Sequence, residues 1–166
     1  MEASKYSQDL LKFIKQKEGF RAKAYICPGG FLTIGYGQRI SESSKYAKKG
    51  ATITEEEASK FVVKNVVLFY DKIKRDWSGF SGVKPCERDA FISLVYNTGF
   101  GFISKTNLYR KFKAGDIKGA AIEFLDIVKS NGKVLRGLVI RRREENYIFL
   151  NGWEAYYSAK SSGMFA

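Results

Sequence analysis

Three side chains that could take part in catalysis lie close together near the N-terminus: Glu18, Cys27 and Thr33. A carboxylate can act as a general acid, an ionised thiol can activate water, and a hydroxyl can orient it. Histidine is absent from the whole chain, which excludes Ser-His-Asp and Cys-His catalytic groups and His-containing zinc sites. With two cysteines, a four-thiolate metal site is excluded as well. Carboxylate chemistry assisted by a thiol suits glycoside cleavage, and no metal or cofactor is expected.

The position of Glu18 follows from a helical pattern. Leu10, Ile14 and Glu18 recur at intervals of four residues, so they share one face of a predicted helix. Gly19 is expected to end that helix. Glu18 should therefore lie at the C-terminal end of the inward-facing stripe.

The next residues predict a β-hairpin. Residues 21–26 and 31–36 are typical of strands, and the Cys-Pro-Gly-Gly run at residues 27–30 is typical of a turn. Cys27 and Thr33 would then flank one hairpin beside the carboxylate.

The spacing of these three residues closely resembles that of the phage-type lysozymes, the endolysin family of tailed phages and prophages. The family pattern is a catalytic Glu, eight residues, an Asp or sometimes a Cys, five residues and a Thr, and Glu18, Cys27 and Thr33 reproduce both intervals. The run TIGYG at residues 33–37 adds to the resemblance. Further similarities lie downstream, at residues 96–99 (YNTG), residues 137–142 (GLVIRR) and Glu145.

The resemblance implies a role for each residue. Glu18 would be the general acid that protonates the glycosidic oxygen, and Thr33 would hold the attacking water. Cys27 stands where most relatives have Asp, and a thiol has an ordinary pKa of about 8.5. As a thiolate it could activate the water, whereas as a thiol it could only position it. Tyr36 could stack on a sugar ring, and the amide of Asn97 could hydrogen-bond a sugar or merely cap a helix.

Four other polar residues bear on the resemblance or allow a structural interpretation. Gln38 is a departure from the family, because relatives usually have His after the TIGYG run. Arg141 and Arg142 could meet anionic groups, but pairing with a buried carboxylate such as Glu145 is favoured. Cys86, the second cysteine, is expected to be a free thiol, as is Cys27.

The remainder of the chain is expected to be mainly helical. Thr54 and Glu57 form a capping box, which predicts a long helix over residues 54–77. A Gly- and Ser-rich break follows at residues 78–82. Further helices are expected at residues 87–96, at 105–113 with Ser104 as a cap, at 117–129 with Asp116 as a cap, at 139–150 and at 153–159.

The resemblance implies a single α+β domain over residues 1–166 with a mainly helical, lysozyme-like fold. Its parts would be a small N-terminal β-hairpin lobe over residues 1–53, a connecting helix over residues 54–77 and a helical C-terminal lobe over residues 78–166. In the family, a saccharide cleft lies between the lobes.

The charge predicts a polyanionic partner. The chain has 29 Lys and Arg against 17 Asp and Glu, a net charge of +12. Nucleic acid, an anionic membrane and the bacterial wall all qualify, and a solvated surface also explains scattered lysines. No nucleic-acid motif accompanies the charge, so no nucleic acid is expected as a partner. Bacterial peptidoglycan is the expected partner, and a monomer is expected.

No targeting segment is visible, and no run approaches the ~20 apolar residues that span a membrane. The protein is expected to be made in the cytoplasm of a host bacterium and to act on the cell wall or periplasm, with dependence on a holin for access. Three functions compete: a muramidase that cleaves the β-1,4 bond between N-acetylmuramic acid and N-acetylglucosamine, a cell-wall-binding protein with weak or no catalysis, and a basic nucleic-acid-binding protein.

Overall fold

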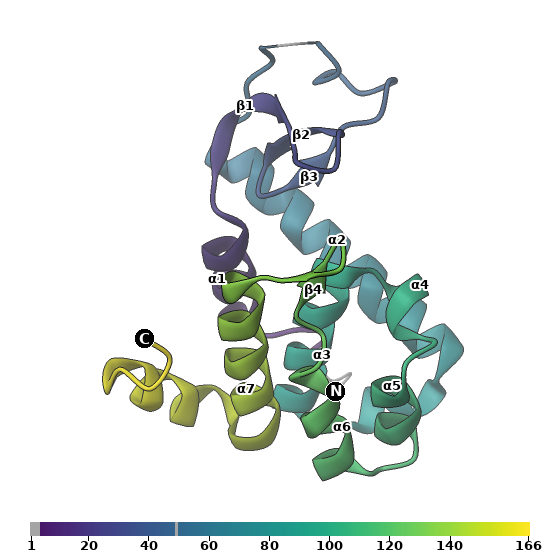
Figure 1. The fold of residues 1–166 in the computed structure, drawn as a ribbon. Coiled ribbons are helices and arrows are strands. Elements are labelled where there is room, and N and C mark those ends of the chain that lie inside the picture. The colour runs from purple at the N-terminus through teal and green to yellow at the C-terminus, as the bar shows by residue number, and fades with distance from the viewer. Residues whose placement is uncertain (1–3, 49) are drawn as a thin grey trace. The chain divides into compact units, whose positions relative to one another are not determined.

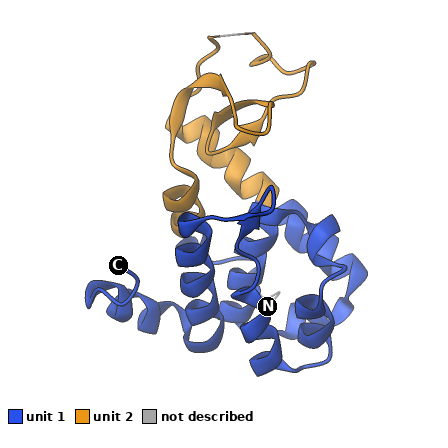
Figure 2. Ribbon diagram, viewed as in Figure 1, with its two compact units in different colours: residues 1–10, 66–166 blue, residues 11–65 orange. Residues whose placement is uncertain are grey.

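The computed structural model describes residues 4–48 and 50–166, which form two compact units (Figure 2). The hairpin unit comprises residues 11–65. The helical unit comprises residues 66–166 together with the segment that ends at residue 10. Two helices, α1 (Gln8–Glu18) and α2 (Glu55–Asp76), each contribute residues to both units.

The hairpin unit is built on a three-stranded antiparallel sheet in the order β1, β2, β3 (Figure 1). Strand β1 spans Arg21–Ile26, β2 spans Leu32–Gly35 and β3 spans Gln38–Arg39. The predicted hairpin is confirmed, while β3 was not expected because a two-residue strand carries no periodic pattern. Thr33 lies in the middle strand, opposite Tyr25 on one side and Arg39 on the other.

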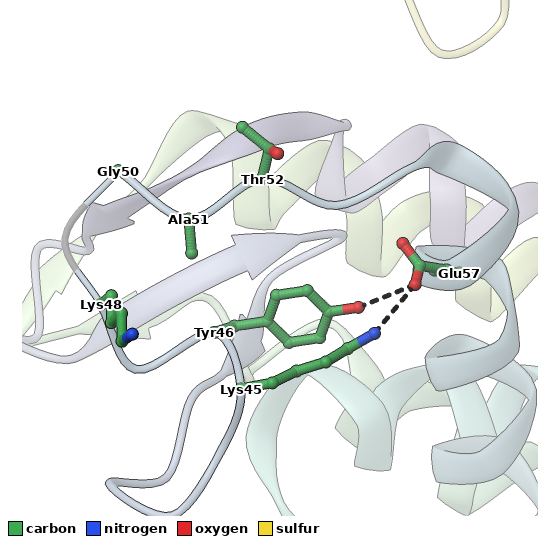
Figure 3. Close-up of a pocket in the computed structure, with 7 residues that line it drawn as sticks. All are labelled: Lys45, Tyr46, Lys48, Gly50, Ala51, Thr52 and Glu57. Carbon is green, nitrogen blue, oxygen red and sulfur yellow. Dashed lines mark hydrogen bonds and ion pairs between the residues drawn. The ribbon is translucent and has the colours of Figure 1, made fainter.

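The predicted capping box at the start of α2 is also confirmed. The Thr54 backbone N–H donates to Glu57 Oε2, and the Glu57 backbone N–H donates to Thr54 Oγ1, both at 3.1 Å. Glu57 also accepts hydrogen bonds from Lys45 Nζ and the Tyr46 hydroxyl, each at 3.1 Å (Figure 3). These bonds, led by the one from the Thr54 backbone, lower the pKa of Glu57 to about 2. One carboxylate thus caps α2 and fastens the preceding loop to it.

The helical unit is organised around α3 (Pro85–Thr98), whose residues 87–95 are all buried. Helix α3 packs against α7 (Arg136–Ser161), and α6 (Ile117–Phe124) contacts both α5 (Asn107–Lys113) and α7. An aromatic cluster fills the core, with Phe112 5.2 Å from Phe91 and 5.0 Å from Phe149 between ring centroids. The other elements are the 3-10 helix η1 (Ser78–Gly82), α4 (Phe100–Ile103), β4 (Lys129–Ser130) and β5 (Lys133–Val134). The predicted α+β, mainly helical class is confirmed.

Two predicted helix boundaries are wrong. Thr106, not Ser104, caps α5, since its side chain accepts a hydrogen bond from the Tyr109 backbone. Helix α6 ends at Phe124 rather than residue 129, and the Leu125 N–H donates to the Ile122 carbonyl at 3.1 Å as the helix closes. Farther along, Asn131 and Gly132 adopt positive φ angles of 50° and 77° and form the turn of the β4–β5 hairpin. The Asn-Gly pair was the sequence signal for this turn.

The other predicted helix boundaries differ from the observed ones by at most three residues, with α3 at 85–98 instead of 87–96 and α7 beginning at residue 136 instead of 139. The Asp116 side chain caps α6, accepting a hydrogen bond from the Gly119 backbone at 2.9 Å. The two C-terminal helices expected on either side of Gly152 form one element, α7, that is interrupted at this glycine, whose φ is 86°.

Candidate active site

Glu18 is the last residue of α1. The Gly19 N–H donates to the Lys15 carbonyl at 3.0 Å, and the left-handed φ of Gly19 (69°) ends the helix there. The half-buried Glu18 side chain reaches the β2–β3 turn, where its Oε2 lies 3.4 Å from the position that a Cβ on Gly37 would occupy. A Cβ at position 37 would be in van der Waals contact with the carboxylate, and any residue other than glycine there would be strained by the φ of 79°.

Cys27 opens the turn between β1 and β2. Its N–H donates to the Phe31 carbonyl at 2.9 Å, and its carbonyl accepts from the Gly30 N–H at 2.8 Å. The thiol is free and partly exposed. Hydrogen bonds from the Phe31 backbone and the Thr33 hydroxyl, with smaller effects from the Gly29 backbone and the charge of Arg39, lower the pKa of Cys27 despite some desolvation. The surroundings thus favour the thiolate.

Thr33 is buried in the middle strand of the sheet. Its hydroxyl lies 2.9 Å from the Phe31 carbonyl and within hydrogen-bonding reach of the Cys27 sulfur. Because it has one proton, it donates to one of these two acceptors at a time. The structure therefore brings Cys27 and Thr33 together, as the hairpin pattern predicted, and places Glu18 in the same compact unit.

Gln38, at the position where relatives usually have His, makes a connection to α2. Its side-chain oxygen accepts from Asn65 Nδ2 at 2.8 Å, and its Nε2 donates to the Arg39 carbonyl at 3.2 Å. Because β3 is only two residues long, these bonds help to hold it in place.

Tyr36 is buried within the hairpin unit. Its hydroxyl donates to Glu55 Oε1 at 2.5 Å, and its ring lies 5.5 Å from that of Phe20. Burial and the neighbouring Glu55 carboxylate raise the pKa of Tyr36 to about 12. These contacts anchor the end of β2, and a direct contact with a sugar stays a prediction.

Asn97 lies on the helical unit, near the end of α3. Its Oδ1 accepts a hydrogen bond from Arg142 Nη2, whereas the helix itself is ended by Gly99, whose N–H donates to the Val95 carbonyl. The side chain of Asn97 is therefore held by an arginine and does not serve as the helix cap. It borders a cavity of about 540 Å³ that is lined by Asn97, Thr98, Phe102, Asp126, Ile127, Lys129, Ser130, Leu135, Leu138 and Arg142.

The arginine that holds Asn97 belongs to a buried ionic network. Arg142 and Glu145 are both fully buried, and Arg142 Nη1 donates to Glu145 Oε2. Arg141 Nε and the Ser93 hydroxyl donate to Glu145 Oε1 at 3.0 and 2.7 Å. The favoured structural role of the two arginines is confirmed.

Two groups near these residues were missed from the sequence. Arg39 acts on Cys27 from β3, and it could not be placed because the strand itself was not predicted. Lys129 and Ser130 line the cavity beside Asn97 as β4 of a hairpin that was not predicted, since the expected helix ran to residue 129.

Among residues 4–48 and 50–166, no cluster of His, Cys, Asp and Glu side chains could hold a metal ion. The described helices include none that is both long and apolar enough to cross a membrane.

The chain is similar to known endolysins. The family model of phage lysozyme matches residues 15–145. The endolysin of Bacillus phage B103 is 35% identical over 158 residues, which is 94% of this chain and 58% of the relative, so the chain spans little more than half of that protein. The endolysin of Acyrthosiphon pisum secondary endosymbiont phage 1 is 34% identical over 86% of this chain and 96% of its own length. The solved muramidase domain of SpmX from Asticaccaulis excentricus is 26% identical with a TM-score of 0.74, covering 87% of this chain and 97% of that domain.

Proposed function

Because the chain belongs to the phage lysozyme family, we propose that it is a peptidoglycan hydrolase that cleaves the β-1,4 bond between N-acetylmuramic acid and N-acetylglucosamine. The observation that carries the proposal is the arrangement of Glu18, Cys27 and Thr33 in one compact unit, with Cys27 and Thr33 in contact. Carboxylate acid catalysis with a second group acting on water is the chemistry of glycoside hydrolysis.

In the proposed mechanism, Glu18 donates its proton to the glycosidic oxygen as the bond to the leaving sugar breaks. Cys27 and Thr33 hold the attacking water on the hairpin. The lowered pKa of Cys27 increases the fraction of thiolate, which can accept a proton from that water or stabilise positive charge on the sugar. The thiolate would thereby take over the part that an Asp carboxylate plays in most relatives.

Two side chains, Asn97 and Tyr36, are proposed to contribute to substrate binding. Asn97 would donate its amide N–H to the glycan or its peptide, since its oxygen is already engaged by Arg142. Tyr36 would contribute through the turn that it anchors. The net charge of +12 would favour approach to the anionic wall. We further propose that the protein acts as a monomer and reaches the wall through a separate membrane pore such as a holin.

The proposal is tested by measuring the release of new reducing ends from purified peptidoglycan under reducing conditions. The unaltered protein, Glu18→Gln and Cys27→Ser are compared, with Glu42→Gln as a control that removes an exposed carboxylate from the same unit. Loss of activity in Glu18→Gln alone, or in Glu18→Gln together with a reduction in Cys27→Ser, supports a muramidase. Wall binding without release of reducing ends by the unaltered protein would overturn it in favour of a wall-binding protein.

A further inference from the structure

Arg39 is linked to Cys27 through two residues that it neighbours, Thr33 and Phe31. On β3 it lies opposite Thr33, whose hydroxyl interacts with the Cys27 thiol. Its guanidinium carbon lies 3.8 Å from the centre of the Phe31 ring, a stacked cation–π contact. The backbone of Phe31 in turn exchanges hydrogen bonds with Cys27. Arg39 thus packs against Phe31, whose backbone is the main hydrogen-bonding partner of the Cys27 thiol.

The groups around the thiol differ in charge. From β2 the thiol meets the Thr33 hydroxyl, and from its own turn the Phe31 and Gly29 backbones, all of which are neutral. From β3 the positive charge of Arg39 acts on the thiol. Strand β1 carries two cations, Arg21 and Lys23. Of these, Arg21 is stacked on the Tyr25 ring at 4.3 Å.

We propose that Arg39 is a positioning residue that stacks on Phe31, lies opposite Thr33 and by its positive charge favours the thiolate form of Cys27. An Asp at this position would be ionised at neutral pH without help, whereas a thiol would not. A nearby cation compensates for that difference. The role in catalysis rests on the proposed function, but the effect on the thiol does not.

The ionisation of Cys27 can be measured without any substrate. In a Cys86→Ser background, which removes the other thiol, the rate of alkylation by iodoacetamide reports the thiolate fraction of Cys27. Arg39→Gln is expected to slow alkylation at pH 7 by about two- to fivefold, the size typical of one exposed charge pair, and to move the pH profile upward. Arg39→Lys should keep most of the rate because it keeps the charge. Arg21→Gln is the matched control, since it removes a stacked arginine from the same hairpin and should leave the rate unchanged.

The salt dependence of the alkylation rate tests the same charge effect with Arg39 in place. Because Arg39 is exposed, raising the NaCl concentration from 20 mM to 1 M should slow alkylation in the Cys86→Ser protein and have little effect in Arg39→Gln. Equal pH profiles of alkylation for Arg39→Gln and its Cys86→Ser parent would overturn the proposal. If Arg39→Gln does not fold, an alkylation rate that does not depend on salt in the Cys86→Ser parent would overturn it instead. If Arg39→Gln slows alkylation as expected but the unaltered protein has no muramidase activity, this inference is upheld and the proposed function is refuted.

Discussion

The helical unit and the hairpin unit hold their polar residues in opposite ways. In the helical unit, Glu145 and Arg142 are fully buried, and Glu145 accepts hydrogen bonds from Arg141, Arg142 and Ser93. In the hairpin unit, Cys27 is partly exposed and borders a turn. The buried carboxylate has its oxygens engaged by protein donors, whereas the exposed thiol can still meet water or substrate. Burial with full pairing therefore indicates a structural role for Glu145, and partial exposure leaves the Cys27 thiol available for chemistry.

The largest expected effect comes from breaking the buried network. Glu145→Gln removes the negative charge and leaves Arg141 and Arg142 buried without it, which should lower the free energy of unfolding by about 3–5 kcal/mol. Glu154→Gln, an exposed change on the same helix, should alter it by less than about 0.5 kcal/mol. Urea unfolding measures both, and similar stabilities for the two variants would contradict the assigned structural role.

At Cys27, substitution is expected to reduce activity and to leave stability nearly unchanged. Cys27→Ser should reduce the release of reducing ends by about a hundredfold, the low end of the contribution of a proton-transfer group, because a serine hydroxyl does not ionise near neutral pH. Cys27→Asp should retain activity, since it restores a charged group at neutral pH. Both variants should unfold at nearly the same urea concentration as their parent, because the side chain is partly exposed. A large loss of stability in either variant would place Cys27 with the structural residues.

The features that local rules govern were predictable from the sequence. Strand β1 has the predicted bounds, and the caps at Thr54 and Asp116 form as expected, since each depends on residues a few positions apart. The motif of Glu18, Cys27 and Thr33 is equally local, and its resemblance to phage-type lysozymes is confirmed by the family match.

The features that were missed depend on tertiary contacts or on short turns. Strand β3 owes its place to pairing with β2 and to the bond between Gln38 and Asn65, which are 27 residues apart. Without that strand, the influence of Arg39 on Cys27 could not be foreseen. The partner of Tyr36 is Glu55, 19 residues away, so the burial of its hydroxyl was also invisible in the sequence.

A smaller effect should separate a structural from a substrate-binding role for Tyr36. Tyr36→Phe keeps the buried ring and removes the hydrogen bond to Glu55, which should cost about 1 kcal/mol of stability. The KM for soluble peptidoglycan fragments should change little, because the hydroxyl is directed to Glu55. A raised KM with unchanged stability would instead indicate a direct sugar contact.

The smallest expected effect concerns Glu57, which is partly exposed like Cys27 but has a structural role. Its pKa is about 2 in the folded protein and about 4.3 in an unfolded chain, so its contribution is fully present above pH 4.3 and is lost as the pH falls through 2. The difference in Tm between the unaltered protein and Glu57→Gln should therefore be constant from pH 7 to pH 5 and shrink toward pH 2. Other carboxyl groups titrate in both proteins, so their effects cancel in the difference. Glu42→Gln should show no such trend, and a pH-independent difference for Glu57→Gln would mean that its charge does not hold the loop to α2.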